Sequence, residues 1–510
     1  MNKYIIAYDL GTGGIKASLY DANGNSITSA FASYDTYYPS SGWHEQKPMQ
    51  WWNAVIETTN ILLNEVDIDR NHIEGIGISG HSLGVIPIDK DGNLIRESIP
   101  IWSDSRAEIQ AERFFKKVDQ EEWYMATGNG FPPPLYSIFK IMWYKDNEPE
   151  MFSKVYKFIG TKDYINFMLT GVACTDYSYA SGSGVYDLVN WKYNEKFIEA
   201  SGIPNSVLPE IVASTKILGN LTPAAAKALG LPESVKVVAG GVDNACMALG
   251  ARGIKDGRVY TSLGSSAWIA VTASKPILNS TKRPYVFTHC IPGMFTSATC
   301  IFAAGSSLNW VRDNICKDMI DKAEKDGLDV YTFINEAGEA SPIGAKGLLF
   351  NPSLAGGSGL DKSPKIRGGF IGLDLAHSQA DMIRATMEGI AMNLRMALDV
   401  LQDYTEMSHQ MLIVGGGGKS KLWRQIFADV YNKEIIKTNV GQDAGSLGAA
   451  ACAAVGTGLW NDFTIIDEIH KTQDIVIPDK PNNTVYERYL KVFSRVADMQ
   501  ADIGDMLSDL

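Results

Sequence analysis

The stretch Asp9-Leu10-Gly11-Thr12-Gly13-Gly14 decides the expected fold, because it joins two runs that are typical of β-strands, residues 4–8 and 15–20. A second stretch with the same layout, Ser262-Leu263-Gly264-Ser265-Ser266, lies about half a chain later and also stands between strand-like runs. Both stretches therefore predict hairpin turns. Turns built from small residues let backbone N–H groups approach a polyphosphate closely. The repeated turn favours two lobes that hold phosphate groups from both sides.

Composition limits the class of protein. A chain of 510 residues with 45% hydrophobic content can form two or three domains. The net charge of −12 argues against nucleic acid and against an anionic membrane as the main partner. No apolar stretch reaches the ~20 residues of a membrane-spanning helix, and no cleavable apolar segment opens the chain, so we expect a cytoplasmic protein.

The six cysteines are scattered and form no C-x-x-C pair. This spacing is typical of buried free thiols in a reducing compartment, and it argues against a disulfide framework or a zinc site.

The first half of the chain alternates strand-like runs with helical stretches, among them residues 51–66 and 107–117, which predicts the α/β class. A small, polar, glycine-bearing segment then precedes the second hairpin. We therefore divide the chain into an N-terminal domain over residues 1–250, a second domain over 251–478, and a helical tail over 479–510.

In the second half, Ser378 and Asp381 predict a capping box at the start of a long helix. Apolar residues then recur at steps of three and four along one helical face, at Ile383, Met387, Ile390, Leu394, Leu398 and Leu401. Farther on, residues 411–414 predict a buried strand, and a run of four glycines leads to a helix that opens at Ser420. A strand, a glycine turn and a helix start commonly hold a nucleotide.

The stretch Gly418-Lys419-Ser420 imitates the end of a P-loop, but Ile413 stands where that motif requires its first glycine. Lys419 therefore receives no P-loop role. We interpret Gly415, Gly416 and Gly417 instead as a flat backbone surface for an adenine or ribose. The alternative is a tight turn with no ligand.

Two aspartates are candidates for chemistry on a phosphate group. Asp9 ends a buried-looking strand just before the small-residue turn, where a hydrated Mg²⁺ could be held beside phosphates; the alternative is an ordinary turn residue. Asp243 follows Gly240-Gly241-Val242, where its carboxylate could deprotonate an acceptor hydroxyl. The alternative for Asp243 is a helix N-cap. Lys16 is either a phosphate contact or a solvated strand residue.

These motifs resemble the FGGY family of carbohydrate kinases, over residues 9 to about 458. Gly368-x-Phe370-x-Gly372-Leu373, followed after seven residues by Asp381-Met382-x-x-Ala385-Thr386-Met387-Glu388, fits the C-terminal signature of the family. Residues 137–147 resemble its N-terminal signature, although Tyr144 and, just ahead of this range, Leu135 depart somewhat from the usual choices of the family. The resemblance implies two RNase H-like lobes of the actin, hexokinase and Hsp70 superfamily, around a cleft for ATP and a sugar.

The same resemblance implies roles for individual residues, with ATP and Mg²⁺ as cofactors and Asp243 as the catalytic base. The residues implied for Mg-ATP are Asp9, Gly11, Thr12, Gly13, Lys16, Gly264, Ser265, Ser266, Gly415, Gly416, Gly417 and Lys419, with Asp9 contacting the metal through water. The residues implied for the sugar are His81, Ser82, Trp102, Asp104, Arg106, Asp243 and Asn244. Plain core packing is the alternative for Trp102 and for His81.

Within the family the chain is most similar to xylulokinases, which implies a ketopentose such as xylulose as the substrate. Xylulokinases have G-Q-M-H-G where this chain has Gly80-His81-Ser82-Leu83-Gly84, and residues 354–359 depart from a common G-E-R-x-P stretch. A polyol, gluconate or a ketohexose therefore stays open as the substrate, and a homodimer stays open as the assembly. Two alternatives of another class are a nucleotide-driven conformational protein and a sugar sensor without catalysis.

Overall fold

The computed structural model describes residues 3–508 and residue 510, which form two compact units. Unit 1 contains the described residues up to Asp256 together with Thr272–Thr296 and Asp443–His470. Unit 2 contains Gly257–Val271, Ser297–Gln442 and the described residues from Lys471 onward. The division of the chain at residues 250 and 478 stays a prediction. No described helix combines the length and the apolar character that crossing a membrane requires.

Unit 1 is built on a mixed β-sheet whose main strand order is β13-β14-β5-β1-β2-β3, with β15 also paired to β5. Its strands are β1 (Tyr4–Leu10), β2 (Gly14–Asp21), β3 (Ser26–Ser33), β5 (Ile73–Gly80), β13 (Ile217–Asn220), β14 (Lys236–Val238) and β15 (Gly241–Val242). Strands β1, β2 and β3 form an antiparallel meander, whereas β14 and β15 lie parallel to β5, and β5 lies parallel to β1. The predicted hairpin around residues 9–14 is confirmed.

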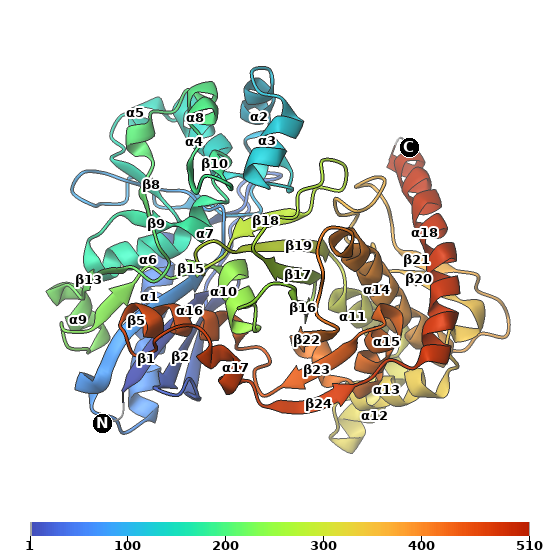
Figure 1. The fold of residues 1–510 in the computed structure, drawn as a ribbon. Coiled ribbons are helices and arrows are strands. Elements are labelled where there is room, and N and C mark those ends of the chain that lie inside the picture. Colours follow the sequence, from blue (N-terminus) through green and yellow to red (C-terminus); the bar gives the residue numbers. More distant parts are fainter. Residues whose placement is uncertain (1–2, 509) are drawn as a thin grey trace. The chain divides into compact units, whose positions relative to one another are not determined.

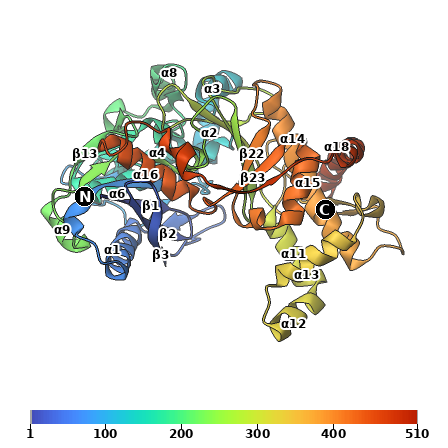
Figure 2. The same ribbon diagram turned by 60° about the horizontal axis from the view of Figure 1, so that its bottom comes forward.

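Helices cover both faces of this sheet, and Figure 2 shows α1 (Pro48–Glu65) and α16 (Ala444–Gly456) on opposite sides of β1 and β2. On the α1 side, Ile76 and Ile78 of β5 join the apolar core of the unit. On the other side α16 lies unusually close, because a Cβ placed on Gly77 would lie 2.1 Å from the carbonyl oxygen of Ala449. The alanine- and glycine-rich sequence of α16 is what permits this approach.

Helix α16 also packs against α10 (Asp243–Gly250), beside which it lies in Figure 1. A Cβ on Gly448 would lie 1.9 Å from the carbonyl oxygen of Cys246, so only glycine fits there. The remaining helices of unit 1 are α2 (Glu108–Phe115), α3 (Gln120–Thr127), α4 (Ser137–Asn147), α5 (Pro149–Phe152), α6 (Thr161–Thr170), α7 (Tyr177–Ala180), α8 (Glu195–Ser201), α9 (Pro223–Leu229) and α17 (Ile465–Ile469). Its short strands are β4 (Glu45–Gln46), β6 (Ile86–Ile88), β7 (Ile99–Pro100), β8 (Lys157–Ile159), β9 (Cys174–Asp176), β10 (Tyr186–Asp187), β11 (Lys192–Tyr193), β12 (Glu210–Val212) and β18 (Tyr285–Thr288). The predicted helices near residues 51–66 and 107–117 are confirmed as α1 and α2.

Unit 2 has its own sheet, with strands in the order β19-β17-β16-β22-β23-β24. These strands are β16 (Arg258–Leu263), β17 (Ala267–Ala273), β19 (Phe295–Ile301), β22 (Gln410–Val414), β23 (Glu434–Thr438) and β24 (Thr472–Val476). Strands β16, β22 and β23 are parallel neighbours, and residues 264–266 form the turn between the adjacent strands β16 and β17. The second hairpin is therefore also confirmed, as is the buried strand at 411–414.

Helices gather beside this sheet in Figure 1. They are α11 (Gly305–Ile315), α12 (Lys317–Asp326), α13 (Val330–Ala340), α14 (Gln379–Gln402), α15 (Lys421–Tyr431) and α18 (Lys480–Ser508), with a small hairpin of β20 (Leu349–Asn351) and β21 (Gly369–Ile371). The predicted long helix is α14. The Asp381 carboxylate accepts a hydrogen bond of 2.8 Å from the Ser378 backbone N–H, as a capping box requires. The predicted helical tail is α18.

A buried charge network joins α14 to α18. Glu388 accepts hydrogen bonds from Arg384 at 2.6 Å, from the Tyr486 hydroxyl at 2.7 Å and from the Gly344 backbone at 3.0 Å. Burial raises the pKa of Glu388, and the Arg384 charge opposes that effect. The pair is therefore an internal ion pair whose two charges depend on each other.

Glu388→Gln is expected to lower the free energy of unfolding by about 3 kcal/mol, because it leaves a buried guanidinium without its counter-charge. Glu487→Gln is the matched control, since Glu487 pairs with Arg395 on the surface and is expected to cost less than about 1 kcal/mol. Urea titrations of the two variants measure the difference, and equal midpoints would contradict the prediction.

Candidate active site

The candidate site residues of unit 1 gather at one edge of its sheet. In the parallel strands β1, β5 and β15, Asp9 lies opposite Ser79, and Val242 lies opposite Gly80. Asp9 is therefore at the end of β1, and Asp243 follows directly after β15. The carboxyl ends of parallel strands are where open α/β sheets bind their ligands.

The Asp9 carboxylate lies beside a serine hydroxyl, a lysine–aspartate ion pair and the first turn of a helix. The Ser79 hydroxyl donates a hydrogen bond of 2.7 Å to its carboxylate, and Lys16 pairs with Asp443 close by. A Cβ on Gly445 would lie 2.7 Å from Asp9 Oδ2, so glycine brings the first turn of α16 to this carboxylate. Burial raises the pKa of Asp9, whereas the Ser79 bond and the Lys16 charge lower it. A lysine and a helix N-terminus beside the carboxylate can hold phosphate oxygens.

The turn after Asp9 is fixed by its neighbours and stays open on one side. The backbone N–H of Gly11 donates to the Gly14 carbonyl at 3.0 Å, and Trp102 Nε1 donates to the Thr12 hydroxyl at 2.9 Å. Gly13 is exposed, and a Cβ placed there would meet nothing within 4 Å. The turn therefore leaves room for a ligand.

Asp243 is the first residue of α10, and Val242 occupies the N-cap position. The alternative interpretation of Asp243 as the N-cap is therefore not supported. Its Oδ1 accepts a hydrogen bond of 2.7 Å from the Asn244 backbone N–H. Burial raises the pKa of Asp243 to about 7; the Asn244 N–H lowers it, and the nearby negative charge of Asp9 raises it further. A carboxylate with this pKa can accept a proton near neutral pH.

The side chains of Asp104 and Arg106 are buried, and the guanidinium donates two hydrogen bonds of 2.9 and 2.8 Å to the carboxylate. Arg106 Nη2 also donates to Glu45 at 2.6 Å, and the guanidinium lies 4.0 Å from the centre of the Trp43 ring. Two carboxylates thus already neutralise this arginine. Its Nη1 is buried and has no hydrogen-bond partner among the described residues, so one donor remains available to a ligand.

The other residues expected near the sugar differ in their surroundings. Asn244 Oδ1 is buried without a hydrogen-bond partner among the described residues, which suits an acceptor for a ligand hydroxyl. Trp102 is 38% exposed, and Ser82 is half-buried. His81 is buried edge-on against Trp51, and burial lowers its pKa to about 3, so the ring is neutral. Leu83 adopts a left-handed backbone conformation with φ of 63°.

Unit 2 contains a cavity of about 490 Å³ beside its hairpin turn and its glycine run. Five of the residues predicted for the nucleotide line it, namely Gly264, Ser265, Gly416, Gly417 and Lys419. Ser266 and Gly415 are neighbours of lining residues in the sequence but do not line the cavity. Gly415 has φ of +92°, and a Cβ there would lie 2.6 Å from the Leu263 carbonyl oxygen, so the turn requires glycine at this position. The volume falls in the range of small-molecule sites.

The rest of this cavity comes from residues that sequence reasoning missed. They are Leu263, Gly305, Leu308, Asn309, Asp329, Tyr331, Thr332, Asn335, Met387, Ser420, Trp423 and Gln442. Trp423 Nε1 donates to the Met387 carbonyl at 3.1 Å, which ties α15 to α14 on one wall. Apolar and aromatic walls with a few amide and carboxylate groups suit a nucleoside. Most of these residues carry no motif.

Sequence reasoning also missed Asp443 and Gly445 beside Asp9. A signal for them exists, because the small polar stretch Gly441-Gln442-Asp443-Ala444-Gly445 leads into an alanine-rich helix. The rule that identified the glycine run before Ser420 would identify this helix start as well.

The chain is similar in sequence and fold to known carbohydrate kinases. Residues 4–250 match the N-terminal domain of the FGGY family of carbohydrate kinases, and residues 259–457 match its C-terminal domain. The chain is 30% identical over 505 residues to the xylulose kinase of Bacillus subtilis (strain 168), covering 98% of both chains. Its fold is similar to that of a ligand-bound xylulose kinase from Lactobacillus acidophilus, with a TM-score of 0.88, 25% identity and 98% of both chains covered. It is also similar to a gluconate kinase from the same organism, with a TM-score of 0.87, 25% identity, and 98% of this chain and 99% of the other covered.

Proposed function

The chain belongs to the FGGY family of carbohydrate kinases, and on this premise we propose that it transfers the γ-phosphoryl group of ATP to a hydroxyl of xylulose. The observation that carries this proposal is the Asp243 carboxylate, which has a pKa of about 7 and lies at the same sheet edge as Asp9 and its small-residue turn. Phosphoryl transfer needs a base near the acceptor hydroxyl and positive groups near the phosphates, and this edge contains both.

The residues of unit 1 divide the work. Asp243 accepts the proton of the attacking hydroxyl, and its raised pKa makes it basic enough to do so near neutral pH. Asp9 would contact Mg²⁺ through water, because magnesium keeps several waters and is held beside one or two carboxylates and phosphate oxygens. When bound, the metal neutralises charge on the phosphates. Lys16 and the start of α16 lie near Asp9, which supports a role for them in holding phosphate oxygens.

In unit 2, the cavity holds the adenosine part of ATP. Gly416 and Gly417 offer a side-chain-free surface to the base or ribose, and Gly264 and Ser265 bring the backbone of the hairpin turn to the cavity, where phosphates can approach it. Lys419 lines the cavity as a cation without a P-loop role.

The choice of a neutral sugar over an aldonate rests on the charges near Arg106. An aldonate brings its own carboxylate, which a binding site must meet with an available cation. Arg106 already faces the carboxylates of Asp104 and Glu45, and Lys140 is buried, with its ammonium donating to the carbonyl oxygens of Leu83 and Ile101. This arrangement favours the hydroxyl groups of xylulose over gluconate.

ADP release from Mg-ATP, measured with xylulose, ribulose, fructose, gluconate and glycerol, tests the proposed substrate. We expect kcat/KM for xylulose to exceed that for gluconate by at least about tenfold, which corresponds to 1.4 kcal/mol of transition-state binding. A preference for gluconate would contradict the charge argument. If the rate of ATP hydrolysis is the same with and without each sugar, a nucleotide-driven conformational protein is favoured. Sugar binding without ADP release would favour a sensor.

The pH dependence of kcat/KM is expected to report Asp243. The base acts in its deprotonated form, so its raised pKa means that activity is full above about pH 7 and falls about tenfold per pH unit below it. Initial rates between about pH 5 and 9, at constant ionic strength and saturating Mg²⁺, measure this profile. An inflection near pH 4 would contradict the assignment, because an ordinary solvated aspartate would titrate there.

A further inference from the structure

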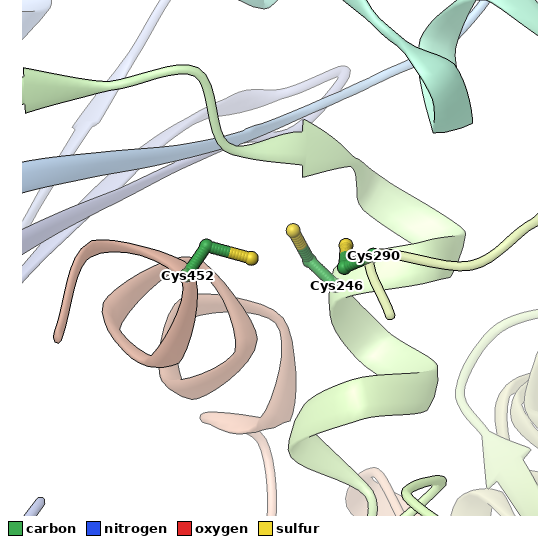
Figure 3. Close-up of side chains that lie close together, drawn as sticks. All are labelled: Cys246, Cys290 and Cys452. Atoms are coloured by element: carbon green, nitrogen blue, oxygen red, sulfur yellow. The ribbon is translucent and has the colours of Figure 1, made fainter. Parts of the chain in front are cut away.

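Three buried cysteines meet in unit 1, beneath the strand that leads to Asp243. Cys246 lies in α10, Cys452 lies in α16, and Cys290 follows β18. Their sulfur atoms all lie within 4.8 Å of one another, and the three residues are 0 to 2% exposed. Figure 3 shows the sulfurs of Cys246 and Cys452 directed toward each other from the two helices, with Cys290 beside Cys246. No close sequence spacing indicates this group, because three separate segments contribute one thiol each.

Close backbone packing holds the sulfurs in this arrangement. A Cβ on Gly241 would lie 2.6 Å from Cys290 Sγ and 3.1 Å from Cys246 Sγ, so β15 passes directly over both. Gly448 of α16 fits against the backbone of Cys246 in the same way, at 1.9 Å from its carbonyl oxygen. These contacts hold the three sulfurs close together in the core.

We propose that Cys246, Cys290 and Cys452 form a three-sulfur site for a soft d¹⁰ metal ion such as Cu(I). Thiolate ligands select soft ions. With metal–sulfur bonds of about 2.3 Å, as for zinc thiolates, a trigonal site places its sulfurs about 4.0 Å apart. Since all three sulfurs lie within 4.8 Å of one another, no pair has to approach by more than about 1 Å.

The ligand set also excludes the commoner ions. Among the described residues, no histidine or carboxylate joins the three thiols. A structural Zn²⁺ site takes four ligands, and Mg²⁺ and Ca²⁺ take oxygen ligands. A three-coordinate ion fits three sulfurs that are closed to solvent.

Occupancy would connect α10, α16 and the segment after β18 through one ion. Cys246 lies one helical turn after Asp243, so the ion would restrain the helix on which that carboxylate stands. The binding itself does not rest on the proposed kinase function. The competing explanation is that the thiols are small apolar side chains filling the core.

Titration of the reduced, full-length protein with Cu(I) alone, under anaerobic conditions and against a chromophoric Cu(I) chelator, tests the site. We expect the wild type to hold about one equivalent, and Cys452→Ala and Cys246→Ala to lose it. Cys174→Ala is the matched control, since Cys174 is another buried free thiol of unit 1 and lies outside the group. The control is expected to keep the equivalent.

Thermal unfolding gives the second measurement. Free Cu(I) at 100 times its Kd is expected to raise the ratio of folded to unfolded wild type by about 100-fold, and to leave Cys452→Ala unchanged. If Cys452→Ala does not fold without the ion, Cys290→Ala replaces it, because residue 290 lies outside the two helices. The proposal would be overturned if the wild type retained no Cu(I). It would also be overturned if the folded cysteine-to-alanine variants of the site retained as much Cu(I) as the wild type.

Discussion

Asp243→Asn is expected to lower sugar-dependent ADP release by about 10²- to 10⁴-fold, the usual contribution of a general base. The change keeps the size of the side chain and can keep the hydrogen bond of 2.7 Å from the Asn244 backbone, so α10 should begin as before. What is lost is the group that accepts a proton near neutral pH. Stopped and continuous assays of ADP release with xylulose measure the change in kcat.

Two further measurements distinguish loss of the catalytic base from a general loss of ATP binding or of folding. ATP binding, measured by calorimetry, is expected to stay within about twofold of the wild type, because the amide removes no phosphate contact. Asp91→Asn is the matched control for unit 1, since Asp91 is an exposed carboxylate of a surface turn, and its activity is expected to be unchanged. Turnover of Asp243→Asn near the wild-type rate would remove Asp243 from the catalytic role.

Local rules predicted the parts of the fold that depend on neighbours in sequence. The turn before Gly14 and the capping box of Ser378 with Asp381 were found this way, because hydrogen bonds within a few residues decide them. The structure also shows Gly416 and Gly417 lining a cavity, and their contact with a nucleotide stays a prediction. Each of these features has a short sequence pattern with one physical cause.

Contacts between distant segments could not be predicted in this way. The position of Gly445 against Asp9 depends on how α16 packs across β1, and the cavity residues Asn309 and Asn335 come from helices that carry no motif. Ion-pair partners are equally hidden in the sequence, because nothing in it shows that Arg106 shares its charge with Asp104 and Glu45. The contact of Arg106 with a sugar stays a prediction. A sequence shows which polar side chains are present, but it does not show which of them form hydrogen bonds or ion pairs with each other.

Asp9→Asn tests the metal assignment on the same sheet edge. It is expected to lower kcat/KM for ATP by about 10²- to 10³-fold and to raise the Mg²⁺ concentration that gives half-maximal rate, with KM for the sugar unchanged. The amide can still accept the 2.7 Å hydrogen bond from Ser79, so the side chain should stay in place while its charge is lost. Rates measured over a matrix of Mg²⁺ and ATP concentrations separate the two effects.

Asp443→Asn distinguishes loss of a metal ligand from a general change of charge near Lys16. Asp443 pairs with Lys16, and its side chain is 38% exposed, so its removal frees the lysine for phosphate instead of removing a ligand of the metal. We therefore expect a change of less than about tenfold in kcat/KM for ATP and an unaltered Mg²⁺ requirement. If Asp9→Asn and Asp443→Asn shift the Mg²⁺ requirement equally, the metal is held by the summed negative charge at the start of α16, and Asp9 has no special part in holding it. A shift confined to Asp9→Asn means that the carboxylate at the end of β1 binds the ion.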